Sequence, residues 1–151
     1  MPRVVLVHPE IPPNTGNIAR TCAATRTPLH LVEPLGFELS DRYLKRAGLD
    51  YWPYVDLHLH PSWTAFVAAA REQPGRLIGF SKSGVECYTD IEYAPDDWLL
   101  FGKETAGLST DILAACDTTA RIPMAEPGVR SLNLSASAAI GLFEALRQMQ
   151  V

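Results

Sequence analysis

The sequence lacks the features that mark membrane, secreted and metal-binding proteins. Its 151 residues contain no apolar run long enough to cross a bilayer, and the opening MPRVVLVHPE has no apolar core or cleavage site of a signal peptide. Only three cysteines occur, Cys22, Cys87 and Cys116, too few and too widely spaced for a disulfide framework. No Cys/His spacing is typical of a zinc site. We therefore expect a cytoplasmic protein with no membrane partner and no metal.

Several common catalytic motifs are also missing. The sequence has no GxGxxG after its first apolar run, no GxxxxGK[ST], no HExxH and no GxSxG. This excludes a common dinucleotide-binding or Rossmann methyltransferase loop, a P-loop, a zinc protease and a nucleophile elbow. His58 and His60 share one face of a predicted strand, where core-edge or surface histidines are expected more often than metal ligands.

The charge of the chain does not decide whether it binds nucleic acid. A formal net charge of −4 argues against a large nucleic-acid surface. The basic residues are unevenly spread, however, and Arg42, Lys45 and Arg46 stand close together. Either a local basic face or an ordinary solvated surface is compatible with this pattern.

Short apolar runs alternate with helix-like segments along a single predicted domain, residues 1–151. The predicted strands are Arg3–His8, Leu29–Glu33, Tyr54–His60, Arg76–Ser81, Trp98–Gly102 and Thr119–Met124. The predicted helices are Asn14–Arg26, Ser40–Gly48, Pro61–Gly75, Ser109–Cys116 and Ser131–Met149. This alternation predicts an α/β fold with a parallel sheet covered by helices on both faces. Ligands of such sheets bind beyond the carboxyl ends of the strands.

Polar residues gather in the loop after the first strand, HPEIPPNTGNIAR. Asn14 and Thr15 are expected to cap the following helix. Asn14, Asn17 and Arg20 recur at steps of three, which places them along one side of its first turns. Such a group can hold phosphate or ribose oxygens. An ordinary capped helix with polar surface residues explains the pattern equally well.

A second loop, FGKETAGLS, follows the strand Trp98–Gly102. Gly102 permits close approach of a ligand or another backbone segment. Glu104 would place a carboxylate at the mouth of the crevice. A solvent-exposed turn is the alternative.

The last helix opens with Arg130-Ser131-Leu132-Asn133 and is apolar on two faces. Ser131 and Asn133 are expected to cap its free amide groups. One face carries Leu132, Ala136, Ala139, Ile140 and Phe143, and the other carries Leu134, Ala138, Leu142, Ala145 and Met149. Because only one face can pack on the sheet, the second predicts a homodimer.

Three segments in this order, EIPPNTGNIAR, FGKETAGL and IPM…RSLNLSASAAI, resemble the motifs of the SPOUT RNA 2′-O-methyltransferases. The resemblance spans Val4 to Met149 and is closest to the small stand-alone branch that methylates the wobble cytidine or uridine of tRNA. It implies a C-terminal deep trefoil knot, an exception to the rule against knotted chains. It also implies S-adenosyl-L-methionine as cofactor, tRNA as substrate and a homodimer.

The resemblance also implies the site residues. The cofactor site would comprise Phe80, Gly102, Ile122, Met124, Ser131 and Leu132. The catalytic set would be Asn14, Arg20, Glu104, Ser131 and Asn133. The tRNA backbone would be held by Arg42, Lys45, Arg46 and Arg130.

Arg20 is a proposed base in the wider family, but a guanidinium is almost always protonated. We therefore expect Arg20 to orient the 2′-hydroxyl or a phosphate, with Glu104 positioning Arg20 or the methionine amine of the cofactor. Three other hypotheses remain: a methyltransferase acting on another tRNA or ribosomal RNA position, a non-catalytic RNA-binding module of the same fold, and a generic nucleotide-binding domain.

Overall fold

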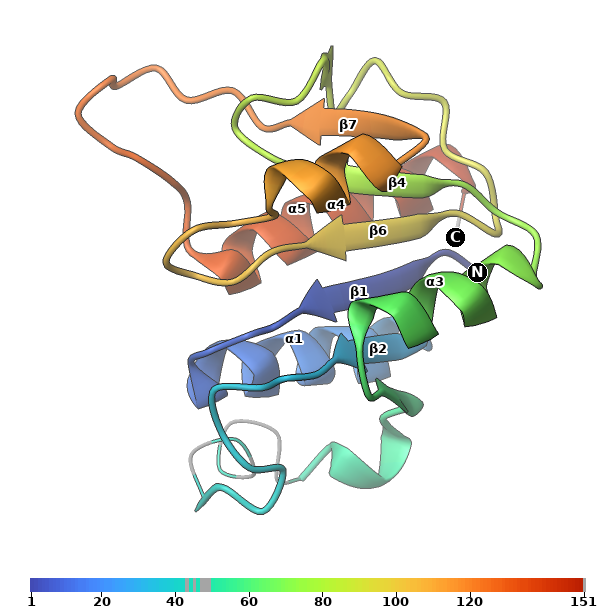
Figure 1. The fold of residues 1–151 in the computed structure, drawn as a ribbon, viewed down its shortest axis with the longest axis vertical. Coiled ribbons are helices and arrows are strands. Elements are labelled where there is room, and N and C mark those ends of the chain that lie inside the picture. Colours follow the sequence, from blue (N-terminus) through green and yellow to red (C-terminus); the bar gives the residue numbers. More distant parts are fainter. Residues whose placement is uncertain (43, 45, 47–49, 151) are drawn as a thin grey trace.

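The computed structural model describes residues 1–42, 44, 46 and 50–150. Their strands form one seven-stranded sheet, whose arrangement is seen in Figure 1. The strand order is β3-β2-β1-β6-β4-β7-β5, and every pairing is parallel. The strands are β1 (Arg3–Val7), β2 (Leu29–Val32), β3 (Leu57–His60), β4 (Leu77–Phe80), β5 (Glu86–Cys87), β6 (Trp98–Phe101) and β7 (Thr118–Arg121). The predicted parallel sheet is thus confirmed. The two-residue β5 was not predicted, because two residues carry no readable alternation.

Helices cover both faces of the sheet, as predicted. They are α1 (Pro12–Thr25), α3 (Trp63–Arg71), α4 (Thr110–Ala115) and α5 (Leu134–Gln148), with a 3-10 helix, η1 (Trp52–Tyr54). Figure 1 shows α1 and α5 behind the sheet and α3 and α4 in front of it. The predicted helix Ser40–Gly48 falls partly outside the described residues. No helix in the described ranges is long and apolar enough to cross a membrane.

The core consists of two layers because successive side chains of a strand point to opposite faces. In β1, Val4 and Leu6 pack with α1 and α5, whereas Val5 and Val7 pack with α3 and α4. All four are buried, and each stabilises the fold by about 1.5–3 kcal/mol relative to an exposed side chain. This double burial explains why the strands are continuous apolar runs rather than alternating ones.

Several predicted bounds were too wide. The strand predicted from Tyr54 begins at Leu57, because Tyr54 itself belongs to η1. The strand predicted to reach Met124 ends at Arg121, two residues before Pro123, which has no amide hydrogen to donate to a sheet. The last helix begins at Leu134 rather than Ser131.

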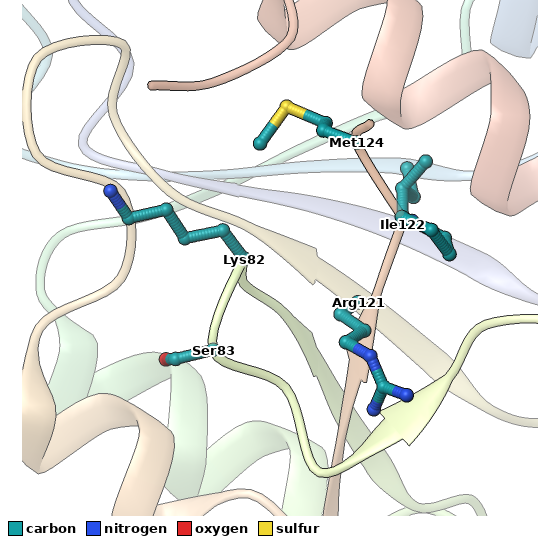
Figure 2. A pocket seen from close by; sticks show the side chains of 6 residues that line it. Lys82, Ser83, Arg121, Ile122 and Met124 are labelled. Atoms are coloured by element: carbon teal, nitrogen blue, oxygen red, sulfur yellow. The ribbon is translucent and has the colours of Figure 1, made fainter. Parts of the chain in front are cut away.

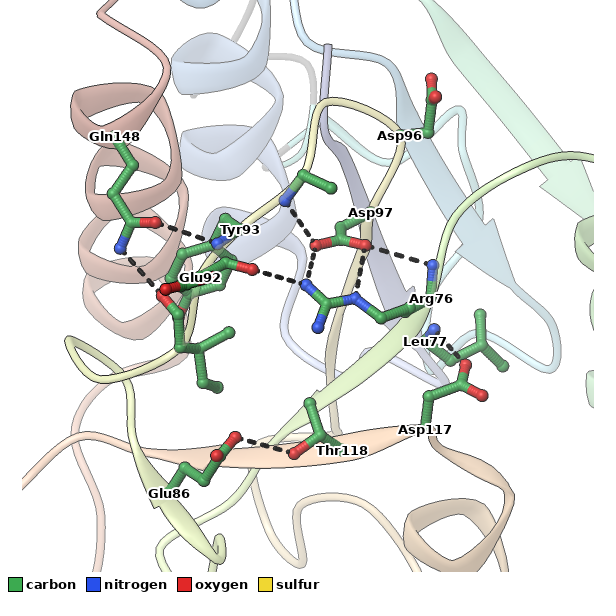
Figure 3. A network of polar contacts seen from close by, with 12 residues as sticks. Arg76, Leu77, Glu86, Glu92, Tyr93, Asp96, Asp97, Asp117, Thr118 and Gln148 are labelled. Atoms are coloured by element: carbon green, nitrogen blue, oxygen red, sulfur yellow. Dashed lines mark hydrogen bonds and ion pairs between the residues drawn. The ribbon is translucent and has the colours of Figure 1, made fainter.

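The carboxyl end of α5 is tied to the segment before β6 (Figure 3). The side chain of Gln148 accepts from the amide of Tyr93 at 2.9 Å and donates to the carbonyl of Ile91 at 2.9 Å. The same segment is held to β4 by the ion pair between Arg76 and Asp97, at 2.6 Å, of which the Asp97 side chain is buried. The last helix is therefore anchored far from its first turn.

Candidate active site

The carboxylate of Glu104 caps the first turn of α1. Glu104 lies just beyond β6, and its Oε2 accepts from the amide of Glu10 at 2.8 Å. Its Oε1 accepts from the amide of Ile11 at 3.0 Å, and the Nδ2 of Asn14 lies 3.5 Å from the same oxygen. Ile11, the N-cap residue, has no side chain that can do this. A negative charge is favourable at a helix N-terminus, so Glu104 supplies the cap from another part of the chain.

The prediction that Asn14 and Thr15 cap this helix was wrong. The helix begins earlier, at Pro12, because two prolines at its first positions lack only amide hydrogens that an α-helix leaves free. Asn14 and Thr15 therefore lie inside the first turn, and both are buried. The Thr15 hydroxyl has no hydrogen-bond partner in the described part of the chain.

Asn14 also contacts the start of α5. The Nδ2 of Asn133 donates to the Oδ1 of Asn14 at 3.0 Å. The Oδ1 of Asn133 accepts from the amides of Ser135, at 2.8 Å, and Ala136, at 3.3 Å, so the predicted cap at Asn133 is confirmed. Ser131, the other predicted cap, is exposed and precedes the helix by three residues. Asn14 and Asn133 thus join the starts of two helices beside Glu104.

A second carboxylate, that of Glu10, binds the loop that carries Glu104. Its Oε1 accepts from the Oγ1 of Thr105 at 2.6 Å and from the Thr105 amide at 3.2 Å. These hydrogen bonds lower the pKa of Glu10 from its ordinary value, the side-chain bond contributing most. The two loops are therefore linked by contacts in both directions. Glu104, after β6, accepts from backbone amides of the loop after β1, and Glu10, in that loop, accepts from Thr105. We did not predict Glu10, although its position in the loop after the first strand was a usable signal.

Arg20 contacts an aromatic side chain. Its guanidinium lies over the ring of Tyr51, 4.6 Å from the ring centroid, and its Nη2 donates to the Tyr51 hydroxyl at 3.3 Å. Within the described residues, the hydrogen-bond partners of Glu104 are Glu10, Ile11 and Asn14, and Arg20 is not one of them. We did not predict Tyr51, since nothing local connects it to a residue 31 positions away.

A cavity of about 510 Å³ lies beyond the carboxyl ends of β4 and β7 (Figure 2). Lys82 and Ser83 line it from the loop after β4, and the segment from Arg121 to Met124 lines it from the end of β7. Two predicted cofactor residues, Ile122 and Met124, are among the lining residues. The loop after β4 was missed, although polar residues directly after a predicted strand were a signal for it. This position is the usual one for ligands of parallel sheets.

The other predicted cofactor residues are not among the described residues that line this cavity. The ring of Phe80 is buried, stacks on Phe101 at 4.6 Å and packs against α5. Gly102 is required by the chain itself, because a Cβ there would lie 2.0 Å from the backbone of Gly107. Ser131 and Leu132 are exposed on the segment between β7 and α5.

The candidate tRNA-binding residues lie on two segments. Arg130 is exposed on the segment between β7 and α5, and Arg42 and Arg46 are exposed between β2 and η1. Lys45 lies outside the described residues. Within the described ranges, no three His, Cys, Asp or Glu side chains form a group that could hold a metal ion.

The two faces predicted for the last helix have different environments. Leu134, Ala138, Leu142 and Ala145 are buried against the sheet. On the other face, the Phe143 side chain is 52% exposed. A hollow of about 290 Å³ beside it is lined by residues at the end of α1 and on α5, including Arg26 and Leu146. Within the described residues, Leu132, Ala136 and Phe143 on this face are exposed, so part of the second apolar face is left uncovered.

Relatives of this chain match it from end to end. A protein of Synechocystis sp. (strain PCC 6803) is 59% identical over 150 residues, covering 99% of this chain and 98% of that protein. A tRNA (cytidine(34)-2′-O)-methyltransferase of Burkholderia ambifaria is 50% identical over 147 residues, covering 96% of this chain and 94% of that enzyme.

Solved structures share the fold. One, which concerns 2-OH methylation of C/U34 on tRNA, has a TM-score of 0.95 and 49% identity, and covers 99% of this chain and 97% of that one. The SpoU methyltransferase AviRb of Streptomyces viridochromogenes, in complex with AdoMet, has a TM-score of 0.88 and 29% identity, and covers 99% of this chain and 60% of that one. The model of the SpoU rRNA methylase family matches residues 1–143. With this agreement of sequence and fold, the chain belongs to the SpoU rRNA methylase family.

Proposed function

We propose that this protein transfers a methyl group from S-adenosyl-L-methionine to the ribose 2′-hydroxyl of the wobble nucleotide, C34 or U34, of tRNA in the cytoplasm. The observation that carries the proposal is the cluster of Glu104, Asn14 and Asn133, where the starts of two helices meet beside the sheet. Relatives matched over nearly their full length include a tRNA (cytidine(34)-2′-O)-methyltransferase and a structure that concerns methylation of C/U34 on tRNA, and both support the substrate. The acidic net charge of the chain is compatible with a tRNA substrate, because exposed Arg46 and Arg130 provide local positive charge.

The cavity after β4 and β7 fits the cofactor in size and chemistry. Its volume of about 510 Å³ lies in the range of small-molecule sites, and Ile122 and Met124 offer apolar contacts for a nucleoside base. Ser83 and Lys82 add polar groups on the opposite wall. S-adenosyl-L-methionine bound there would supply the electrophilic methyl group.

The chain's own residues would align the ribose and stabilise charge. Asn14 and Asn133 hold each other and would fix the geometry of the ribose site. Arg20 would orient the 2′-hydroxyl or the adjoining phosphate and stabilise negative charge as the oxygen loses its proton. A guanidinium is a poor base, so phosphate or water would take the proton. Glu104 would hold the first turn of α1, which carries Asn14.

We further propose that the chain forms a homodimer and a C-terminal trefoil knot. The uncovered face of α5 around Phe143 supports the dimer, because an apolar face of this kind is usually buried against a partner. The knot is proposed from the resemblance of the three ordered motifs to those of the SPOUT methyltransferases, which implies it.

Nucleoside mass spectrometry tests the activity. Purified protein is incubated with S-adenosyl-L-methionine and unmodified tRNA transcripts, and the digested product is analysed by position. We expect one 2′-O-methylated pyrimidine at the wobble position and none with Arg20→Ala. A ribose methyl at another position would keep the reaction and replace the target. Absence of any methyl transfer with tRNA binding intact would favour an RNA-binding module.

A further inference from the structure

We infer that Tyr51 is a positioning residue that sets the orientation of the Arg20 guanidinium for methyl transfer. The inference rests on the proposed function and deepens it. Its first observation is a double contact: the Tyr51 ring lies under the guanidinium at 4.6 Å, and the Tyr51 hydroxyl accepts from Nη2 at 3.3 Å. The stacking limits tilt of the guanidinium plane, and the hydrogen bond limits rotation within it.

Both partners are carried by ordered elements. Arg20 lies in the interior of the 14-residue helix α1. Tyr51 precedes η1, whose turn is closed by hydrogen bonds from the amide of Tyr54 to the carbonyl of Tyr51, at 2.9 Å, and from Val55 to Trp52, at 3.1 Å. Trp52 and Val55 pack against the core formed by α1 and α5. The position of Tyr51 is therefore set by the packing of the residues that follow it.

The contact leaves the guanidinium available for substrate. Arg20 and Tyr51 are both exposed, Tyr51 to 40%. A guanidinium has five N–H donors, and Tyr51 takes one of them in the described part of the chain. The remaining donors can bind the 2′-oxygen or a phosphate in a fixed plane. Tyr51 thus supplies an orienting contact for Arg20. Glu104, which we expected to position either Arg20 or the methionine amine of the cofactor, has its carboxylate engaged at the start of α1.

Tyr54 provides a matched control. It lies three residues further on, at the end of η1, and it is 74% exposed. Tyr51→Phe keeps the ring and removes the hydrogen bond, whereas Tyr51→Leu removes both contacts. Comparison with Tyr54→Leu therefore separates the specific contact from a general effect of losing an exposed aromatic side chain.

The test compares kcat and KM for methyl transfer to tRNA, with the melting temperature as a check of folding. We expect kcat to fall on the order of 10-fold to 10²-fold in Tyr51→Leu and less in Tyr51→Phe, with nearly constant KM values, because misorientation affects the transition state. Tyr54→Leu should match the wild type. In an Arg20→Lys background, adding Tyr51→Leu should lower kcat little further, since Tyr51 acts through Arg20. Wild-type kcat in Tyr51→Leu, or fully additive losses in the double variant, would overturn the inference.

Failure of the proposed function is seen separately, as a wild-type protein that transfers no methyl to tRNA. The positioning contact is then judged by the side-chain N–H resonance of Arg20 in NMR spectra, assigned by its loss in Arg20→Lys. We expect the Tyr51 ring to shift this resonance, and Tyr51→Leu to remove that shift while Tyr54→Leu does not. An Arg20 resonance that is the same in the wild type and Tyr51→Leu would overturn the inference.

Discussion

Asn133 and Asn14 stand 119 positions apart in the sequence, yet the Nδ2 of one donates to the Oδ1 of the other at 3.0 Å. The same Asn133 side chain caps α5 through its Oδ1, and Asn14 approaches Glu104 through its Nδ2. A single amide therefore serves both helix stability and the geometry of the candidate site. Substitutions can separate the two roles, because one uses the oxygen and the other uses the nitrogen.

We predict that Asn133→Ser preserves stability and impairs activity. Serine is as good an N-cap as asparagine, but its shorter side chain lacks the Nδ2 group that donates to Asn14. Asn133→Ala should lose both functions and about 1 kcal/mol of unfolding free energy. Urea unfolding and tRNA methyl transfer, measured on both variants, check this. Normal methyl transfer by Asn133→Ser would show that the contact with Asn14 is dispensable.

Glu104→Gln should weaken the start of α1. The amide has one acceptor oxygen where the carboxylate has two, so either the Glu10 amide or the Ile11 amide faces an NH₂ group. Loss of one hydrogen bond and of the charge at the helix N-terminus should cost about 1–2 kcal/mol of unfolding free energy. Glu72→Gln, the same change at the carboxyl end of α3, is the control and should cost nothing. Equal unfolding free energies for the two variants would contradict the capping role.

Phe143→Glu should convert the proposed dimer into monomers. The side chain is 52% exposed on the uncovered face of α5, and a carboxylate there would be costly to bury against a second copy. Sedimentation velocity should give a dimer for the wild type and for the apolar control Phe143→Leu, and a monomer for Phe143→Glu. If Phe143→Glu remains dimeric, the interface lies elsewhere.

Stability should fall as the pH falls from about 6.5 toward 3, in part through His30. Burial lowers the pKa of His30 to about 3, and His58, stacked on it, and His60, with its Nε2 2.9 Å from the His30 Nδ1, contribute further. The unfolded chain binds this proton near pH 6.5, whereas the folded chain does not, so acid favours unfolding.

The expected slope from His30 is at most about 1.4 kcal/mol per pH unit. Urea unfolding at pH 7.5, 6 and 5 measures it, and His30→Gln should reduce it. The groups around His30 are His58, His60, the Trp98 ring and Arg3, and none of these is a carboxylate that would favour the proton. An unchanged slope in His30→Gln would assign the acid sensitivity to other groups.

Most of the secondary structure could be predicted because its signals are local. Apolar runs such as that of β1 and caps such as Ser109 in α4 need only neighbouring residues. Errors occurred where a distant contact replaced a local one. Asn14 was expected to cap α1 from its own sequence, whereas Glu104 caps it from the loop after β6.

Two partners in the site were not predicted, because each holds a residue far away in the sequence. Glu10 holds Thr105 across 95 positions, and Tyr51 holds Arg20 across 31. Resemblance to a family placed Arg20 and Glu104 in a catalytic set but could not say which side chains orient them. In the structure, Arg20 contacts Tyr51, whereas Glu104 contacts the start of α1. These contacts depend on how the segments that carry Tyr51 and Glu104 pack against α1.

The sequence by itself determined the α/β class, the parallel sheet, the family and the two apolar faces of the last helix. Each of these depends on the periodicity of neighbouring residues or on the order of motifs, which can be read without the tertiary structure. Only the tertiary structure decided the strand order, the pairing of Asn14 with Asn133, and the hydrogen bonds by which the carboxylates of Glu10 and Glu104 link their two loops. The physical reason is that a hydrogen bond depends on distance in space, and residues far apart in sequence approach only when buried strands bring their ends to one edge of the sheet.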